Sequence, residues 1–255
     1  MTLHEKHWAF TLIELLVVIS IIALLIGILL PALAMGRDAA QTSICLSGQR
    51  QLAIGVSAYA GDYDDHIPRG PDTENSFIAL AFGGSAKEDK LASSIILNTS
   101  GQTGQVYLNA HGTLLLGYLE DPHSMFCPGD DTADPIQELE KVRTWTPPAF
   151  SSYVYRNLDQ APKGRLGDMG TNDLGVPATA LGFDSNSIFR SNFPGPSTYR
   201  TNHEARIANA MYVDGHAKTF DNTEHAFSLT AADYAGWTAI EGAYNRFLQY
   251  ADANP

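Results

Sequence analysis

One apolar run near the N-terminus limits what this chain can fold into. The segment from Leu15 to Met35 is interrupted only by Ser20, Gly27 and Pro31. In a helix, about 20 residues at ~1.5 Å each match the ~30 Å hydrocarbon core of a bilayer. The run therefore predicts a helix that crosses a membrane, and it argues against a soluble cytosolic protein.

Three kinds of N-terminal segment fit such a run: a secretory signal peptide, a plain membrane anchor, and an anchor whose leader is removed ahead of the run. A signal peptide has an apolar stretch of about 7–15 residues before a site of small residues. Ala32-Leu33-Ala34 looks like such a site. The run is longer than that stretch, however, and Pro31 fits a kinked helix that continues. The sequence thus favours an anchor, plain or processed.

Glu14 separates the two kinds of anchor. A carboxylate inside a membrane segment costs roughly 3 kcal/mol or more, so it needs a partner or a function. Lys6 lies too far back for a contact of the i,i+4 kind. Proteolysis between Ala9 and Phe10 would place a new α-ammonium group four positions before Glu14. The position of Glu14 therefore favours a processed anchor.

The stretch Ala9-Phe10-Thr11-Leu12-Ile13-Glu14-Leu15-Leu16-Val17-Val18 resembles the N-terminus of type IV pilins and type II secretion pseudopilins. The resemblance implies that prepilin peptidase cuts before Phe10 and methylates its amino group. It also implies that Glu14 meets the N-terminal ammonium of a neighbouring subunit, and that Pro31 kinks the helix. The family usually has glycine before the cut, where this chain has Ala9.

After Pro31 the pattern becomes that of an amphipathic helix, which we expect to end near Tyr59. Its apolar residues recur at spacings of three, four or seven: Cys45, Leu52, Val56, Tyr59 and Tyr63. The predicted organisation is a prepilin leader (1–9), a transmembrane and filament-core helix (10–34), its amphipathic continuation (35–60) and an extracytoplasmic globular domain (61–255). This arrangement predicts a single-pass protein of the inner membrane, with its C-terminal domain in the periplasm or outside.

Beyond residue 61, short apolar segments among Gly, Pro, Asn and Asp predict strands in long loops. These segments are Val106–Leu108, Thr113–Leu119, Tyr153–Tyr155, Ala178–Phe183, Ala208–Val213 and Ala217–Phe220. Asp214-Gly215 between the last two is typical of a hairpin with a type I′ turn. The tail from Ser228 to Tyr250 has helical spacing. The predicted fold class is α+β, with the long N-terminal helix packed on a small antiparallel sheet, a pilin-like layout.

The rest of the chain resembles a branch of pseudopilin-like proteins, common in planctomycetes and related bacteria, that ends in a His…Asp-Gly motif. The matching residues are Phe126-Cys127-Pro128-Gly129-Asp130, and His203 followed by Asp214-Gly215. Ten residues separate His203 from Asp214 here, where the family pattern usually has nine.

Cys45 and Cys127 are the two cysteines of the chain. In a domain outside the inner membrane, thiols oxidise, so a Cys45–Cys127 disulfide is expected. Closing a loop of about 80 residues would stabilise the fold by roughly 4 kcal/mol in the chain-entropy treatment. The alternative is a pair of free, buried thiols.

Asp62, Asp64 and Asp65 place three carboxylates in one turn, a density that Ca²⁺ could use. The spacing is not that of an EF-hand loop, and such acids also cap helices and solvate loops. Some pseudopilins bind calcium in a loop near the C-terminus, so the resemblance makes Asp184, Asp214 and Asp221 alternative ligands. No other cofactor is predicted, so the choice is between a calcium site and a capped turn.

The charge excludes one class of partner and the motifs give little support to catalysis. With 16 basic and 28 acidic residues, the net charge is -12, which disfavours binding to nucleic acid. His203, Asp214 and His216 are the candidates for metal ligands or a base, but no nucleophile elbow, His-Glu-x-x-His or phosphate loop is present. We therefore do not expect an enzyme.

The sequence thus predicts a pseudopilin or minor pilin-like subunit that assembles through its N-terminal helix. Its expected partners are prepilin peptidase, other pilin-like subunits and an inner-membrane assembly platform. The alternative is a membrane-tethered module that binds a carbohydrate or protein without polymerising. The 11 Tyr, 11 Phe and 3 Trp residues would give such a module its stacking surfaces, although aromatic residues are more often core.

Overall fold

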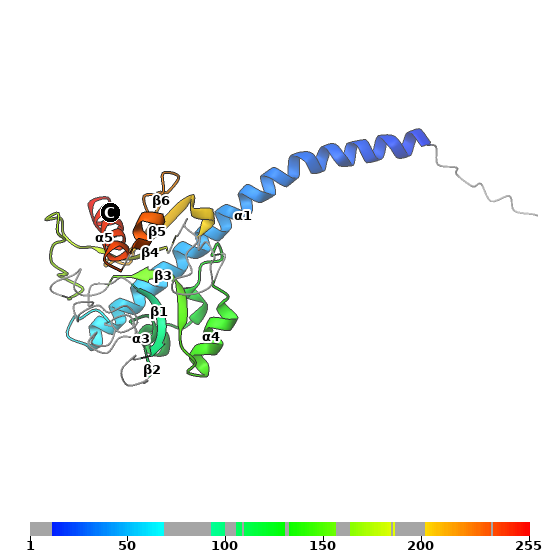
Figure 1. Cartoon of the computed structure of the whole chain (residues 1–255). Helices are drawn as coiled ribbons and strands as arrows, with labels where there is room; N and C mark the ends of the chain where they lie inside the picture. The colour runs from blue at the N-terminus through cyan, green and yellow to red at the C-terminus, as the bar shows by residue number, and fades with distance from the viewer. Residues whose placement is uncertain are drawn as a thin grey trace, which may run out of the picture. The chain divides into compact units, whose positions relative to one another are not determined.

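The computed structural model describes residues 12–68, 93–99, 106–108, 110–130, 133–156, 164–184, 186, 202–235 and 237–255 (Figure 1). The chain forms two compact units, Met1–Ala40 and Gln41–Pro255. Helix α1 (Leu12–Asp62) begins in the first unit and ends in the second. The other elements all belong to the second unit.

Helix α1 combines two kinds of surface along its 51 residues. Residues 12–40 are all exposed, and this half carries the apolar run with Glu14 and Pro31. The buried residues of α1 all lie between Cys45 and Ala60. Among the described residues, α1 is the helix that is long and apolar enough to cross a membrane. The helix predicted from about residue 10 to about Tyr59 is thus confirmed, and it extends to Asp62.

A six-stranded antiparallel sheet forms the centre of the second unit, in the order β2-β1-β3-β4-β5-β6. Its strands are β1 (Ser93–Thr99), β2 (Val106–Leu108), β3 (Ala149–Tyr155), β4 (Ala180–Asp184), β5 (Ile207–Tyr212) and β6 (Ala217–Asp221). The remaining helices are α3 (Ala110–Gly117), η2 (Pro122–Met125), α4 (Pro135–Arg143), η4 (His203–Ala205), η5 (Ala231–Ala235) and α5 (Trp237–Ala253). The predicted α+β fold is confirmed, with a long N-terminal helix on an antiparallel sheet.

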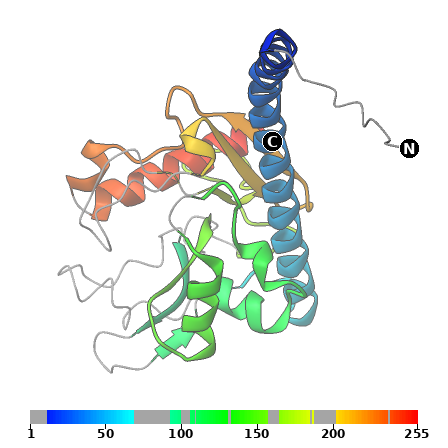
Figure 2. The same cartoon turned by 90° about the vertical axis from the view of Figure 1, so that its right-hand side faces the viewer.

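Two apolar clusters cover the two faces of this sheet. In β3, Tyr153 and Tyr155 pack with the α1 residues Leu52 and Val56, whereas Val154 belongs to the cluster around α5. This alternation follows from the two-residue period of a strand, in which neighbouring side chains point to opposite faces. Figure 2 shows α5 and α1 as separate helices, with strands of the sheet between them.

A bulge in β4 interrupts the alternation. Ala180 pairs with Tyr212 and Gly182 pairs with Met211, so β4 advances by two residues where β5 advances by one. An extra residue of this kind reverses which face each later side chain meets. As a result Phe183 packs in the cluster around α5, and Asp184 faces α1, where it accepts a hydrogen bond from Gln49.

Two details of the predicted secondary structure are wrong. Thr113–Leu119, expected as a strand, lies mostly in helix α3, because a short apolar run does not by itself distinguish a strand from a buried helix. The β5–β6 hairpin is present, but only Gly215 of its Asp-Gly pair has positive φ, at 86°. A type I′ turn needs positive φ at both positions. The predicted tail helix is present as α5, although it begins at Trp237 and ends at Ala253.

Candidate functional site

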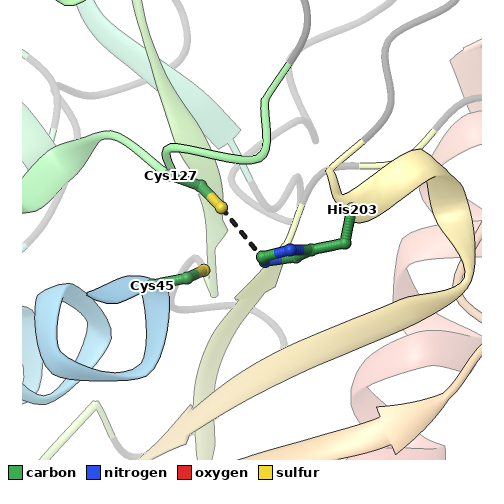
Figure 3. Close-up of side chains that lie close together, drawn as sticks. All are labelled: Cys45, Cys127 and His203. Carbon is green, nitrogen blue, oxygen red and sulfur yellow. Dashed lines mark hydrogen bonds between the residues drawn. The ribbon is translucent and has the colours of Figure 1, made fainter. Parts of the chain in front are cut away.

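Two thiols and an imidazole converge between α1 and the sheet (Figure 3). Cys45 comes from α1, Cys127 from the segment after η2, and His203 from the turn before β5. Their two Sγ atoms and one ring nitrogen all lie within 4.8 Å of one another. Cys127 Sγ is 3.2 Å from His203 Nε2. The exposed fractions are 0% for Cys45, 4% for Cys127 and 9% for His203. Among the described residues, this is the one group of three or more His, Cys, Asp or Glu side chains close enough to hold a metal ion.

The segment that carries Cys127 is shaped by its own sequence. Asp121 caps η2 by accepting a hydrogen bond from His123 N, and Pro122 occupies the first helical position, where its missing N–H is not needed. After the helix the chain turns back, so that Gly129 N donates to Cys127 Sγ at 3.4 Å. The sulfur is therefore fixed by its own loop.

Helix α1 approaches this segment closely at Gly48. A Cβ atom added there would lie 2.7 Å from Ser124 O and 3.1 Å from Tyr153 Oη. A residue larger than glycine would push the helix away from the segment, since a contact of 2.7 Å is too short for a real Cβ atom. Gly48 thus allows Cys45, one turn earlier on α1, to reach Cys127.

His203 is held by an unusual backbone. His203, Glu204 and Ala205 have positive φ values of 51°, 55° and 55°. For residues other than glycine this left-handed conformation costs roughly 1–2 kcal/mol each. Such local strain is concentrated at functional sites, where the surrounding structure enforces it. Here His203 N donates to Gly129 O, which fixes the turn beside Cys127.

A buried carboxylate and a buried amide complete the group. Cys45 Sγ donates to Asp184 Oδ1 at 3.3 Å. The other oxygen, Asp184 Oδ2, accepts hydrogen bonds from Asn209 N and Nδ2, both at 2.9 Å. Asn209 Nδ2 also lies 3.4 Å from both Cys45 Sγ and His203 Nε2. Asp184 and Asn209 are both fully buried. We call Cys45, Cys127, Asp184 and His203 the dithiol cluster.

The protonation of the dithiol cluster is set by burial and by its internal hydrogen bonds. Burial, followed by the neighbouring Cys127, raises the pKa of Asp184 to about 7. Burial likewise raises the pKa of Cys45. The hydrogen bond from Cys45, followed by that from His203, holds the pKa of Cys127 below its usual value. Cys127 is therefore the more acidic of the two thiols, and it lies beside the imidazole of His203.

The expected Cys45–Cys127 disulfide is not formed, so that prediction is wrong. The two cysteines do lie close together. Both cysteines are free thiols. Each sulfur instead takes part in other hydrogen bonds: Tyr153 Oη and Asn209 Nδ2 donate to Cys45 Sγ, and Gly129 N donates to Cys127 Sγ. A disulfide would need the sulfurs at about 2.05 Å from each other.

The three aspartates of the predicted calcium site are used in closing the end of α1. Asp62 accepts a hydrogen bond from Tyr118 Oη, and Asp65 accepts one from Gly167 N. Asp64 and Asp65 have positive φ values of 51° and 68°, which reverse the chain after the helix. These contacts are those of a capped turn, and the calcium site stays a prediction.

The structure separates the two parts of the terminal motif. His203 lies before β5, whereas Asp214 and Gly215 form the turn after it. Asp214 accepts a hydrogen bond from His216 N, as a turn aspartate does. The motif therefore supplies a member of the dithiol cluster at one end of β5 and a hairpin turn at the other. Ala9 and Phe10 lie outside the described residues.

Comparisons of the chain with protein families, with curated proteins and with solved structures found no match. The function is therefore inferred from the residues of the chain and their geometry. Two features stand out: the exposed apolar half of α1 and the buried dithiol cluster.

Sequence reasoning named Asp184 only as an alternative calcium ligand, and it did not single out Asn209. Asp184 comes at the end of an apolar strand, where a carboxylate is unusual, and this was the available signal. The face of the sheet to which the Asp184 side chain points depends on the bulge in β4. The sequence pattern of the strand does not reveal this bulge. Asn209 is the polar residue in the middle of the buried strand β5.

Proposed function

We propose that the chain is a pilin-like structural subunit that is anchored in the inner membrane by α1, processed before Phe10 and assembled through this helix into a filament. The observation that carries the proposal is the division of α1. One helix presents an apolar half whose residues are all exposed, and it continues into a half that is packed in the globular unit. A domain that needed only a membrane anchor would not require this continuous helix, because a flexible linker would be enough to tether it.

The exposed half of α1 needs an apolar environment. Its large apolar side chains are 45–87% exposed from Leu12 to Met35. Exposed apolar surface of this extent marks a site that contacts lipid or other protein. A bilayer before assembly and neighbouring helices after assembly would supply such contacts to the same residues. The helix is thus suited to both environments without a change in its own structure.

Glu14 supports assembly over simple anchoring. It is the acidic residue in the first turn of the described helix. In a low-dielectric surrounding, the attraction between a carboxylate and an ammonium is strong, and each group is costly without the other. An α-ammonium group at Phe10 of a neighbouring subunit would supply the opposite charge. This contact would set the axial position of one helix against the next.

The test is intact-mass analysis of the chain extracted from membranes, combined with cross-linking in the cell. The proposal predicts a chain that starts at a methylated Phe10 and forms a ladder of cross-linked oligomers. A chain that starts at Met1 would indicate a plain anchor, and one that starts at Met35 a secreted domain. Either start would overturn the proposal.

A substitution at Glu14 tests the role of the helix directly. We expect Glu14→Ala to insert in the membrane and fold, but to lose the oligomer ladder. Asp38→Ala is the matched control, because Asp38 is an exposed acid of the same helix beyond the apolar run. An unchanged ladder in Glu14→Ala would contradict the proposal. A chain that forms no ladder even as wild type, yet retains a ligand, would be the tethered binding module.

A further inference from the structure

We propose that the dithiol cluster is a structural zinc site, with Cys45, Cys127, His203 and Asp184 as the four ligands. The proposal concerns the globular unit alone, so it does not depend on whether the chain forms a filament. It assigns a function to two buried thiols that lie side by side without being joined.

The donor set selects the class of metal. Thiolates with imidazole and carboxylate are typical zinc ligands, whereas Ca²⁺ and Mg²⁺ take oxygen ligands. Iron–sulfur clusters are held mainly by four cysteines, and blue-copper sites use two histidines with one cysteine. Two cysteines, one histidine and one aspartate therefore favour Zn²⁺ in a closed, four-coordinate site.

The spacing of the donors fits a tetrahedral ion. Two thiolates that each lie about 2.3 Å from a tetrahedral zinc are about 3.8 Å apart. In the structure, all three donor atoms of Cys45, Cys127 and His203 fall within 4.8 Å of one another. Asp184 Oδ1 lies 3.3 Å from Cys45 Sγ but outside the group of mutually close donors, so its carboxylate would have to move toward Cys127 and His203 to become the fourth ligand.

The groups around the donors orient them as the outer shell of a metal site does. Gly129 N and Asn209 Nδ2 donate to the two sulfurs, and Asn209 also holds Asp184 Oδ2. This leaves Asp184 Oδ1 beside Cys45, with Gln49 as a second donor to it. Such partners fix the direction of the ligands, and their loss commonly lowers metal affinity 10–100-fold.

The burial of the dithiol cluster favours an ion over a substrate. A cysteine beside a histidine could also form a nucleophile and its base. Here Cys127 and His203 are 4% and 9% exposed, and Cys45 is fully buried against them. Buried anionic donors are generally paired with a cation or coordinate a metal. Zn²⁺ would provide that positive charge and would link α1, the segment after η2, β4 and the turn before β5.

The first test is the metal and thiol content of the full chain, purified in detergent without reductant. We expect one zinc ion per chain and two free thiols after denaturation. Recovery of a Cys45–Cys127 disulfide, of a metal-free chain that takes up no zinc, or of copper or iron in place of zinc would overturn the proposal.

Cobalt replacement provides a readout that needs no variant. After removal of zinc by a chelator, added Co²⁺ should give thiolate-to-cobalt charge-transfer bands and the intense d–d bands of a tetrahedral site, and Zn²⁺ should abolish both. Weak octahedral bands would contradict the proposed ligands.

Variants then assign the ligands. Cys127→Ser and His203→Gln should each lose stoichiometric zinc, and Asp184→Asn should lower zinc affinity at least about 10-fold. His216→Gln is the matched control, because His216 lies in the hairpin at the other end of β5 and stacks on Tyr212. Circular dichroism of each variant establishes that it is folded. Folded Cys127→Ser and His203→Gln chains that keep one zinc ion would exclude these residues as ligands.

Discussion

Arg156 and Asp252 form a salt bridge that is completely enclosed by the protein. Two guanidinium nitrogens of Arg156 donate to the two carboxylate oxygens of Asp252, at 3.1 and 2.6 Å, and both side chains are 0% exposed. Asp252 also accepts hydrogen bonds from Thr179 N and Ala180 N. The pair thereby fastens the C-terminal helix α5 to strand β4 and to the residue that follows β3.

We expect Asp252→Ala to destabilise the globular unit by about 3–5 kcal/mol, because it leaves the Arg156 guanidinium buried without its counter-charge. Chemical denaturation of the full chain in detergent would measure this loss. The matched control is Glu140→Ala, which breaks the bidentate pair with Arg143 on the surface. This exposed pair should contribute far less, because solvent screens it. Equal losses in the two variants would show that enclosure of the pair is unimportant.

Gly129→Ala should displace the imidazole of His203. A Cβ atom at residue 129 would lie 2.7 Å from His203 Nδ1 and 3.1 Å from His203 N, so both ring and backbone would have to move. Crowding of this kind commonly costs about 1–3 kcal/mol. Thermal unfolding checks the stability, and the histidine proton resonances check the ring. Gly117→Ala, which meets nothing within 4 Å, is the control. A His203 resonance that is unchanged in Gly129→Ala would refute the predicted contact.

The second half of α1 is predicted to be a structural part of the globular unit. Leu52 is 0% exposed and Ile54, two positions later on the same helix, is 62% exposed. Leu52→Ala should therefore lower the free energy of unfolding by about 2–5 kcal/mol, since it leaves a cavity. Ile54→Ala should change it by no more than about 0.5 kcal/mol. The two variants, compared by denaturant titration, should differ clearly; similar effects would mean that α1 does not pack as described.

His111 should make stability depend on pH. Burial lowers the pKa of His111 to about 3 in the folded chain, against about 6.5 when unfolded. Between these values the unfolded chain binds a proton that the folded chain does not. The His111 contribution to stability is thus fully present above pH ~6.5 and falls by about 1.4 kcal/mol per unit as the pH drops toward 3.

The measurement is the difference in unfolding free energy between wild type and His111→Gln across this interval. A difference is needed because it cancels the titration of the groups that the two chains share. His123→Gln is the control, since His123 is 63% exposed in its side chain. If the unfolding free energy of the wild type changed with pH in parallel with that of His111→Gln, His111 would not be the source of the pH dependence.

The geometry around His111 explains the direction of this effect. Its Nδ1 lies 2.8 Å from Ser151 Oγ, which itself donates to Tyr153 O. His111 Nε2 has no hydrogen-bond partner within the described part of the chain. A proton added to Nε2 would therefore create a buried cation whose new N–H group has no acceptor there.

The sequence predicted secondary structure best in long segments where the apolar residues follow a single helical spacing. The apolar run and the stripe from Cys45 to Val56 predicted α1 because burial on one face of a helix imposes a regular spacing. Thr113–Leu119 could not be assigned in this way, since its run is too short for a period to be recognised. The hairpin at Asp214-Gly215 was predicted from turn chemistry, although its turn is not of the predicted type.

The candidate site was only partly accessible to such reasoning. Cys45 and Cys127 were expected to form a disulfide; they lie close together, but as free thiols. His203 was singled out through a motif. Their meeting in one place depends on tertiary packing, including the close approach of α1 at Gly48. The free state of the thiols depends on hydrogen bonds from residues far away in the sequence, which no local pattern records.

The bulge in β4 makes the length of this strand as critical as its composition. If one residue between Ala180 and Phe183 were deleted, every later side chain of the strand would turn to the opposite face. Asp184 would then enter the aromatic cluster around α5, and Phe183 would point at the cysteines. A single-codon deletion there would exchange a carboxylate and a phenyl ring without substituting any amino acid, so we expect this strand to tolerate conservative substitutions better than any change in its length.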